Sequence, residues 1–256
     1  RRACHLRPSQ IRLLRSRTVL SPTDSKMRLD RFLSNLPQLN RQAARQLLAS
    51  GRVKVDGAVV CDGLCEVSQF SRIEVDSELL QAGKAARYFM LHKPIGVVSA
   101  TAHEQHRTVL DLLDEPDKAD LHLAGRLDLN TSGLLLITND GQWSRRLTEP
   151  RSRLGKVYRV ETEQLITPEY VEVFARGLYF AYEDLTTLPA ELVILDSHSA
   201  LLTLHEGRYH QVKRMFGHFR NRVVALHRES MGEIILDPQL APGQYRALTD
   251  AEIASV

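Results

Sequence analysis

AGRLDLNTSG, residues 124–133, is a loop-like stretch that runs directly into the apolar segment LLLIT at residues 134–138. The apolar segment is typical of a buried strand, and the loop places one carboxylate, Asp128, between glycines at the mouth of that strand. Loops on a rigid scaffold can present a side chain to a ligand at little cost in packing. In most proteins, however, such an aspartate is only a turn residue, because its carboxylate bonds the neighbouring backbone.

Cations nearby and in two later clusters give Asp128 a second interpretation. Arg126 lies in the same loop, and further cations and a tyrosine follow in KVYRV at 156–160 and GRYHQVKRM at 207–215. An aspartate near such cations stays ionised at neutral pH, and an ionised carboxylate can act as a nucleophile. The pattern therefore makes Asp128 a candidate catalytic residue.

The composition predicts a soluble protein with two domains. The chain has 256 residues, 43% hydrophobic and 25% charged, which allows one sizeable core and a second, smaller one. No apolar run approaches the roughly 20 residues that cross a bilayer. Cys4, Cys61 and Cys65 are too few for a disulfide framework and have no second Cys/His pair at zinc-like spacing. We therefore expect a reducing compartment, no membrane span and no metal site.

The net charge of +3 is unevenly distributed along the chain. Residues 1–26 hold seven of the 34 Lys and Arg and one of the 31 Asp and Glu, which leaves 27 basic and 30 acidic residues, or −3, from Met27 onward. Any nucleic-acid binding must therefore come from local basic patches.

Residues 1–26 show no convincing secondary structure and are rich in Arg and Ser. Two interpretations compete: an organellar transit peptide, and a disordered extension ahead of a start at Met27. Because the amphipathic signal is faint and a helical pattern follows Met27 at once, we favour the extension and a cytoplasmic protein.

Residues 27–76 predict a compact helix-helix-hairpin unit. A second helix runs from an N-cap at Asn40 to a terminator at Gly51, and alternating residues on both sides of Asp56-Gly57 predict the hairpin. Residues 28–54 of the unit carry six cations, and a cationic surface of this kind usually meets solvent and binds no partner. Its cations within residues 28–54, opposed only by Asp30, are Arg28, Arg31, Arg41, Arg45, Arg52 and Lys54.

Residues 77–87 lack a strand period and predict a linker, and residues 88–256 predict a larger domain. Its expected strands are 88–91, 134–138, 157–162, 191–195 and 201–205. Its expected helices are 143–147, 168–176 and a last helix that Thr249 and Glu252 begin with a capping-box pattern. Since strands outnumber helices and do not alternate regularly with them, we expect an α+β fold with a mixed, mostly antiparallel sheet.

Two basic segments flank the candidate loop. Residues 145–159 and 206–228 each contain six Lys and Arg and one acidic residue, and they include Lys156, Arg208 and Arg214. They would suit a track for RNA phosphates, although charge runs are usually just solvated faces.

The first unit resembles the S4 RNA-binding domain. MRLDRFLSNLPQLNRQAARQLLASGRVKVDGAVV, residues 27–60, matches the opening of that domain, its arginine-bearing second helix and its hairpin. The resemblance implies binding of structured RNA through phosphates and shape, which fits the cations of this unit.

The rest of the chain resembles the pseudouridine synthases, in the branch that has an N-terminal S4 domain and modifies ribosomal RNA. Four segments match the motifs of that branch in the right order: KPIG at 93–96, AGRLDLNTSGLLLITNDG at 124–141, KVYRV at 156–160 and EGRYHQVKRM at 206–215. RLD alone would be a weak signal, whereas four ordered motifs are a specific one.

This resemblance implies an isomerisation of uridine that needs no cofactor or metal. By position, Asp128 is the nucleophile toward a flipped-out uridine, and Tyr158 lies under the uracil, where its hydroxyl helps remove the C5 proton. Lys213 is the basic partner of the carboxylate, with Arg214 as the alternative; many relatives have Arg where Lys213 stands. Arg126 holds the RNA as the base leaves the stack.

DGQWSRRLTEP at 140–150 and GRYHQVKRMF at 207–216 resemble the small-subunit branch of this family. They predict modification of a uridine of 16S rRNA, uridine 516 in conventional numbering, in free RNA or in a partly assembled small subunit. Two alternatives stay open: a uridine of 23S rRNA, and a non-catalytic S4-type RNA-binding or ribosome-assembly factor. We expect a monomer, because no apolar surface stripe is left unexplained.

Overall fold

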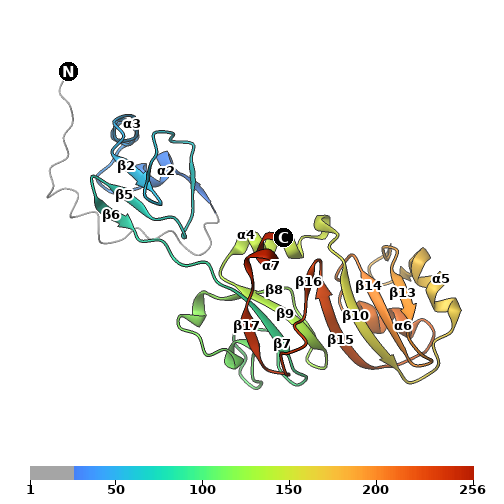
Figure 1. The fold of residues 1–256 in the computed structure, drawn as a ribbon. Coiled ribbons are helices and arrows are strands. Elements are labelled where there is room, and N and C mark those ends of the chain that lie inside the picture. Colours follow the sequence, from blue (N-terminus) through green and yellow to red (C-terminus); the bar gives the residue numbers. More distant parts are fainter. Residues whose placement is uncertain (1–25) are drawn as a thin grey trace. The chain divides into compact units, whose positions relative to one another are not determined.

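The computed structural model describes residues 26–256, so the predicted extension lies outside the described residues apart from Lys26. The chain divides into two compact units between Ala86 and Arg87 (Figure 1). Across the described residues, no helix combines the length and apolarity required to span a membrane.

The N-terminal unit has two short helices and small antiparallel sheets. Helix α3 (Arg41–Ala49) begins as predicted, because the Asn40 side chain accepts a hydrogen bond from the Ala43 N–H at 2.8 Å. Gly51, with φ +67°, follows its end. The remaining elements are β1 (Met27–Arg28), α2 (Leu29–Ser34), β2 (Val53–Val55), β3 (Ala58–Val59), β4 (Glu66–Val67), β5 (Ile73–Val75) and β6 (Glu78–Gln81).

Strand β6 corrects the prediction of a linker from residue 77. It pairs with β5 at the edge of a sheet ordered β3-β2-β5-β6. Asp76 and Ser77, the two residues between these strands, have φ values of 50° and 66°, so they form a hairpin turn of the type that usually contains Asn-Gly. The strand lacked a sequence signal because its first three residues are all half-buried and do not alternate.

The C-terminal unit is built on one mixed sheet of nine strands, ordered β13-β14-β10-β15-β9-β7-β17, with β16 beside β15 and β8 beside β9 (Figure 1). All pairings are antiparallel except the one between β9 and β15. This arrangement confirms the predicted α+β fold. The strands are β7 (Tyr88–Lys93), β8 (His122–Ala124), β9 (Ser132–Thr138), β10 (Lys156–Thr162), β13 (Glu191–Ile194), β14 (Ser199–Leu204), β15 (Val223–Met231), β16 (Ile234–Ile235) and β17 (Tyr245–Ala247).

The helices of this unit follow the local signals in the sequence. Helix α5 has the predicted bounds and Pro168 in its first turn, and the capping box of Thr249 and Glu252 forms at α7. The α-helices are α4 (Gly141–Thr148), α5 (Pro168–Arg176), α6 (Gln211–Gly217) and α7 (Asp250–Ala254). The other elements are the short hairpin strands β11 (Tyr179–Phe180) and β12 (Leu185–Thr186) and the 3-10 turns Val109–Leu112, Lys118–Asp120 and Pro150–Ser152.

Strand β9 lies in the core, as its apolar run predicts. Leu134 and Leu136 pack into one hydrophobic cluster, and Leu135 and Ile137 pack into another, so the strand is covered on both faces. A strand covered on both faces has an unbroken apolar sequence, because neither face meets water.

The start of β9 lies very close to its parallel neighbour β15. Gly133 has φ +114°, and a Cβ atom there would lie 2.3 Å from the Arg228 carbonyl oxygen. Only glycine allows this approach. The contact fixes the end of the Asp128 loop against β15, which is itself paired with β10.

Candidate active site

A buried lysine, Lys93, lies at the end of β7 and binds the backbone of the Asp128 loop. Its side chain is inaccessible to solvent, and its Nζ donates to the carbonyl oxygens of Asp128 (3.1 Å), Thr131 (2.8 Å) and Pro94 (3.0 Å). Burial lowers the pKa of Lys93 to about 8, and the negative charge of Asp128 opposes that shift. Through its three hydrogen bonds, the Lys93 ammonium holds the backbone of the loop in place.

Two other buried side chains hold the same loop. Ser99 Oγ accepts from the Leu127 N–H (3.0 Å) and donates to the Leu127 carbonyl (2.7 Å). Arg228, 2% exposed, donates through Nε to the Leu134 carbonyl (2.9 Å) and through Nη1 to the Arg126 carbonyl (3.5 Å). The loop is thus fixed at its start, its middle and its end.

Sequence reasoning did not assign a role to Lys93, Ser99 or Arg228. Lys93 lies in the KPIG segment that supported the resemblance, which was the available signal. Arg228 was only one of several cations in a basic segment, and nothing in the sequence separates a buried arginine from its exposed neighbours.

The carboxylate of Asp128 faces two basic side chains from the region of α6. Lys213 Nζ lies 3.6 Å from Asp128 Oδ2, so the two residues expected to pair do so, and His210 Nε2 lies 3.2 Å from the same oxygen. The Asp128 side chain is 37% exposed. A carboxylate on a rigid loop, beside an ammonium and open to solvent, is available to an incoming substrate.

His210 is a second contact that sequence reasoning did not single out. It precedes α6 with φ +48°, in the left-handed region that few residues other than glycine adopt. Val212, Met215 and Phe216 anchor α6 in the core, which leaves Lys213 on the side of the loop.

Tyr158 and Lys156 lie on β10, between β14 and β15. Tyr158 is half-buried and packs against two core clusters, one of which contains Leu127, the residue before Asp128. Burial lowers the pKa of Lys156, the charge of Arg228 lowers it further, and Glu206 opposes both.

Arg214, the predicted alternative partner of Asp128, points elsewhere, and that prediction is wrong. Its guanidinium makes a double ion pair with Glu183 at 2.6 Å and lies 3.7 Å from the centre of the Phe180 ring. Arg126 is exposed on the loop and forms no ion pair with any other described residue.

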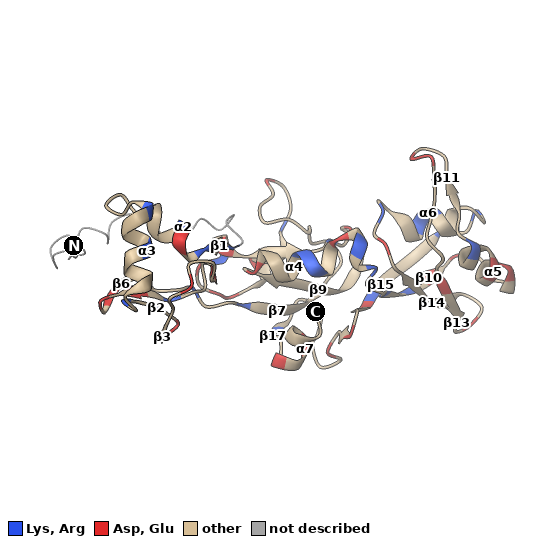
Figure 2. Cartoon of the chain, turned by 90° about the horizontal axis from the view of Figure 1, so that it is seen from above, with Lys and Arg blue, Asp and Glu red and all other residues tan. Residues whose placement is uncertain are grey.

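The two basic segments are less available to RNA than their sequence indicated. Figure 2 shows basic residues on α4 and α6 with acidic residues near them. Four of the arginines are ion-paired: Arg145 with Glu149, Arg159 with Glu229, Arg208 with Glu206, and Arg214 with Glu183.

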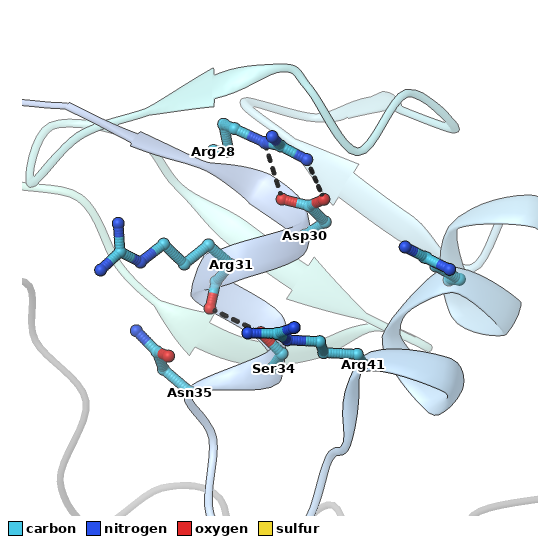
Figure 3. Close-up of a pocket in the computed structure, with 7 residues that line it drawn as sticks. Arg28, Asp30, Arg31, Ser34, Asn35 and Arg41 are labelled. Atoms are coloured by element: carbon cyan, nitrogen blue, oxygen red, sulfur yellow. Dashed lines mark hydrogen bonds and ion pairs between the residues drawn. The ribbon is translucent and has the colours of Figure 1, made fainter.

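The N-terminal unit has a basic cavity of about 640 Å³ at α2 and α3 (Figure 3). Arg28 is engaged by Asp30, and this hydrogen bond lowers the pKa of Asp30. Three lining residues, Arg31, Arg41 and Arg45, form no ion pair within residues 26–256. Arg52 does not line the cavity, because its guanidinium is paired with Asp76 (Nε to Oδ1, 2.7 Å).

Comparison with known proteins gives the family. Residues 87–218 match the RNA pseudouridylate synthase family, and residues 27–62 match the S4 domain. The chain is 64% identical over 230 residues, 90% of its length and 100% of the relative, to the ribosomal small subunit pseudouridine synthase A of Pseudomonas aeruginosa. The Escherichia coli K12 protein of the same name is 45% identical over the same length, 90% of this chain and 100% of the relative.

A solved structure agrees with this match. A crystal structure described as a pseudouridylate synthase is 41% identical, covers 90% of this chain and 99% of its own, and superposes with a TM-score of 0.66. The chain therefore belongs to the RNA pseudouridylate synthase family and carries an S4 domain before its catalytic domain.

Proposed function

We propose that this enzyme converts one uridine of 16S rRNA to pseudouridine, with Asp128 as the nucleophile. The names of the relatives at 64% and 45% identity support a small-subunit substrate. The observation that carries the catalytic role is the solvent-open Asp128 carboxylate, held on a pinned loop with Lys213 Nζ 3.6 Å away.

The proposed reaction replaces the bond between C1′ and N1 by a bond between C1′ and C5, without gain or loss of atoms. The Asp128 carboxylate attacks the uridine, at C1′ or on the base, and the bond between C1′ and N1 breaks. The uracil turns, a bond forms between C1′ and C5, and the bond between the Asp128 carboxylate and the substrate breaks, which restores the free carboxylate. The C5 proton leaves and N1 gains a proton. The product is an isomer of the substrate, so the balance needs no oxidant, reductant or second substrate.

Each neighbour of Asp128 has a place in this scheme. Lys213 provides the counter-charge of the carboxylate, and His210 contacts the same oxygen. Tyr158 lies under the flipped uracil, and its hydroxyl takes part in removing the C5 proton. Extrusion of a base costs a few kcal/mol of stacking, which contacts to aromatic rings and phosphates offset. Arg126, exposed beside Asp128, binds the RNA that the base leaves.

The substrate assignment can be tested by mapping pseudouridine in ribosomal RNA from cells that lack this protein. We expect loss of one pseudouridine in 16S rRNA, at uridine 516 in conventional numbering, and its return when the wild-type gene is restored. Loss of a 23S site instead would contradict the choice of substrate. An unchanged map would contradict catalysis on ribosomal RNA.

We also propose that the cavity of the S4 domain binds RNA phosphates through Arg31, Arg41 and Arg45. Substitution of all three by Ala should lower the slope of log affinity against log salt by about 2 to 3, since each lost phosphate contact lowers it by about 0.7 to 0.9. The measurement is RNA binding over a series of salt concentrations.

Matched controls for this prediction are Lys54→Ala and Arg72→Ala, which remove exposed cations of the same unit that do not line the cavity. These variants should keep the wild-type slope. If the triple variant kept that slope too, the cavity would not be a phosphate site.

A further inference from the structure

A buried glutamine, Gln211, holds the turn before α6 in place with its hydrogen bonds. Gln211, 3% exposed, donates to Glu206 Oε1 (2.8 Å) and accepts from the Arg208 N–H (3.1 Å). Glu206 also accepts from the Leu188 N–H (2.8 Å) and from Arg208 Nε (2.8 Å). These bonds fix the backbone on either side of Tyr209.

Tyr209 is held at the rim of the candidate active site with most of its surface in water. Its ring is stacked on the imidazole of His210, with centroids 3.8 Å apart and planes 22° apart. The same imidazole reaches Asp128 Oδ2 at 3.2 Å through Nε2. Tyr209 is nevertheless 75% exposed, so the stack next to the carboxylate is open to a further ring.

We infer that Tyr209 is a stacking platform for a nucleotide base next to the target uridine. This inference rests on the proposed function. When a uridine leaves the stack, the bases on either side lose a neighbour, and an exposed aromatic ring can replace it. Stacking accepts any base, because every base has a π face.

The position of Tyr209 separates it from Tyr182, another exposed tyrosine of this unit. Tyr182 is 96% exposed on the β11–β12 hairpin, and its ring stacks on no residue that contacts Asp128. Of these two tyrosines, only Tyr209 stacks on a side chain that contacts Asp128, namely His210. Tyr182 therefore provides a matched control for loss of an exposed tyrosine.

The test uses the rRNA fragment on which the wild-type enzyme forms pseudouridine, with 2-aminopurine placed on the 5′ or the 3′ side of the target. Binding to the wild type should quench its fluorescence at one of the two positions. Tyr209→Ala should abolish this quenching and weaken RNA binding by about 5- to 150-fold, the range found when one stacked base contact is lost. Tyr209→Phe should keep both properties, and Tyr182→Ala should behave as wild type.

A substrate with an abasic site at the quenched position provides the second arm. On that RNA, the wild type and Tyr209→Ala should bind equally, because the base that stacks is already missing. An equal loss from Tyr209→Ala on the intact and abasic substrates would overturn the inference. Unchanged quenching in Tyr209→Ala would also overturn it and would leave the ring with only a positioning role toward His210.

The outcome is separate from that of the proposed function. If the wild type modified only a large-subunit fragment, the 16S assignment would fail, and the Tyr209 arms would be read on that fragment in the same way. If Asp128→Asn remained active, the nucleophile assignment would fail without any effect on the quenching result.

Discussion

Asp128→Asn is expected to reduce pseudouridine formation by at least about 10⁴-fold, because an amide cannot replace a carboxylate as the nucleophile. The substitution preserves the size and shape of the side chain. The backbone of the loop is held by Lys93, Ser99 and Arg228 through main-chain atoms, none of which the substitution changes. We therefore expect the fold to be unaffected.

The measurement for Asp128→Asn is single-turnover conversion of 16S rRNA, together with equilibrium binding of the same RNA. Binding should stay within about threefold of wild type, because the variant removes an anion and leaves every proposed phosphate contact in place. Asp114→Asn, at an exposed loop aspartate of the same unit, is the matched control and should keep full activity. Turnover by Asp128→Asn above about 1% of wild type would exclude Asp128 as the nucleophile.

Asp128→Glu separates the charge from its position. The glutamate keeps the carboxylate but moves it by about one methylene, and a misplacement of about 1 Å in an active site can cost about 100-fold in rate. A rate between those of wild type and Asp128→Asn is expected. Full activity in this variant would mean that the pinned loop is not needed for placement.

Local signals predicted much of the fold. The caps at Asn40 and Thr249 and the proline at the start of α5 each act within one helical turn, so their effect can be read from neighbouring residues. The strand at Glu78–Gln81 was missed because its residues do not alternate, and because its hairpin turn consists of Asp-Ser rather than a residue pair that favours positive φ.

The candidate site was predictable in part, because the resemblance supplied Asp128, Tyr158 and Lys213. It favoured Lys213 and kept Arg214 as the alternative, since adjacent residues on a helix point about 100° apart and the phase of α6 depends on its packing. The acidic partners of the arginines, Glu183 and Glu229 among them, come from other parts of the sequence. A count of charges along the chain could not reveal which cations they engage.

Lys93→Met is expected to lower kcat by about 100-fold and the free energy of unfolding by about 2 to 4 kcal/mol. Methionine has a similar length but cannot donate, so the carbonyls of Asp128, Thr131 and Pro94 lose a buried donor. The loop would then relax and Asp128 would move from its position beside Lys213. The measurements are chemical denaturation and saturation kinetics under conditions in which the variant remains folded.

Two further variants separate the loss of the Lys93 hydrogen bonds to the loop from a general loss of stability. Leu192→Ala creates a cavity beside the edge strand β13, two strands away from β10, and should cost a similar free energy of unfolding with little change in kcat. Ser99→Ala removes the pin at Leu127 and should lower kcat in the same direction as Lys93→Met, by a smaller factor. If Lys93→Met and Leu192→Ala affected kcat equally, the role of Lys93 would be only structural.

The pH dependence of stability provides an independent test of how Lys93 is buried. Its pKa of about 8 in the folded protein lies below the value of 10.5 for a free lysine. Between these pH values the unfolded chain holds a proton that the folded chain has released, so this group makes the free energy of unfolding rise with pH. Lys93→Met lacks this contribution, and the stability difference between wild type and variant should therefore grow from about pH 8 toward pH 10. A difference that shrinks over this range would mean that the carbonyl oxygens around Nζ stabilise the ammonium by more than its burial destabilises it.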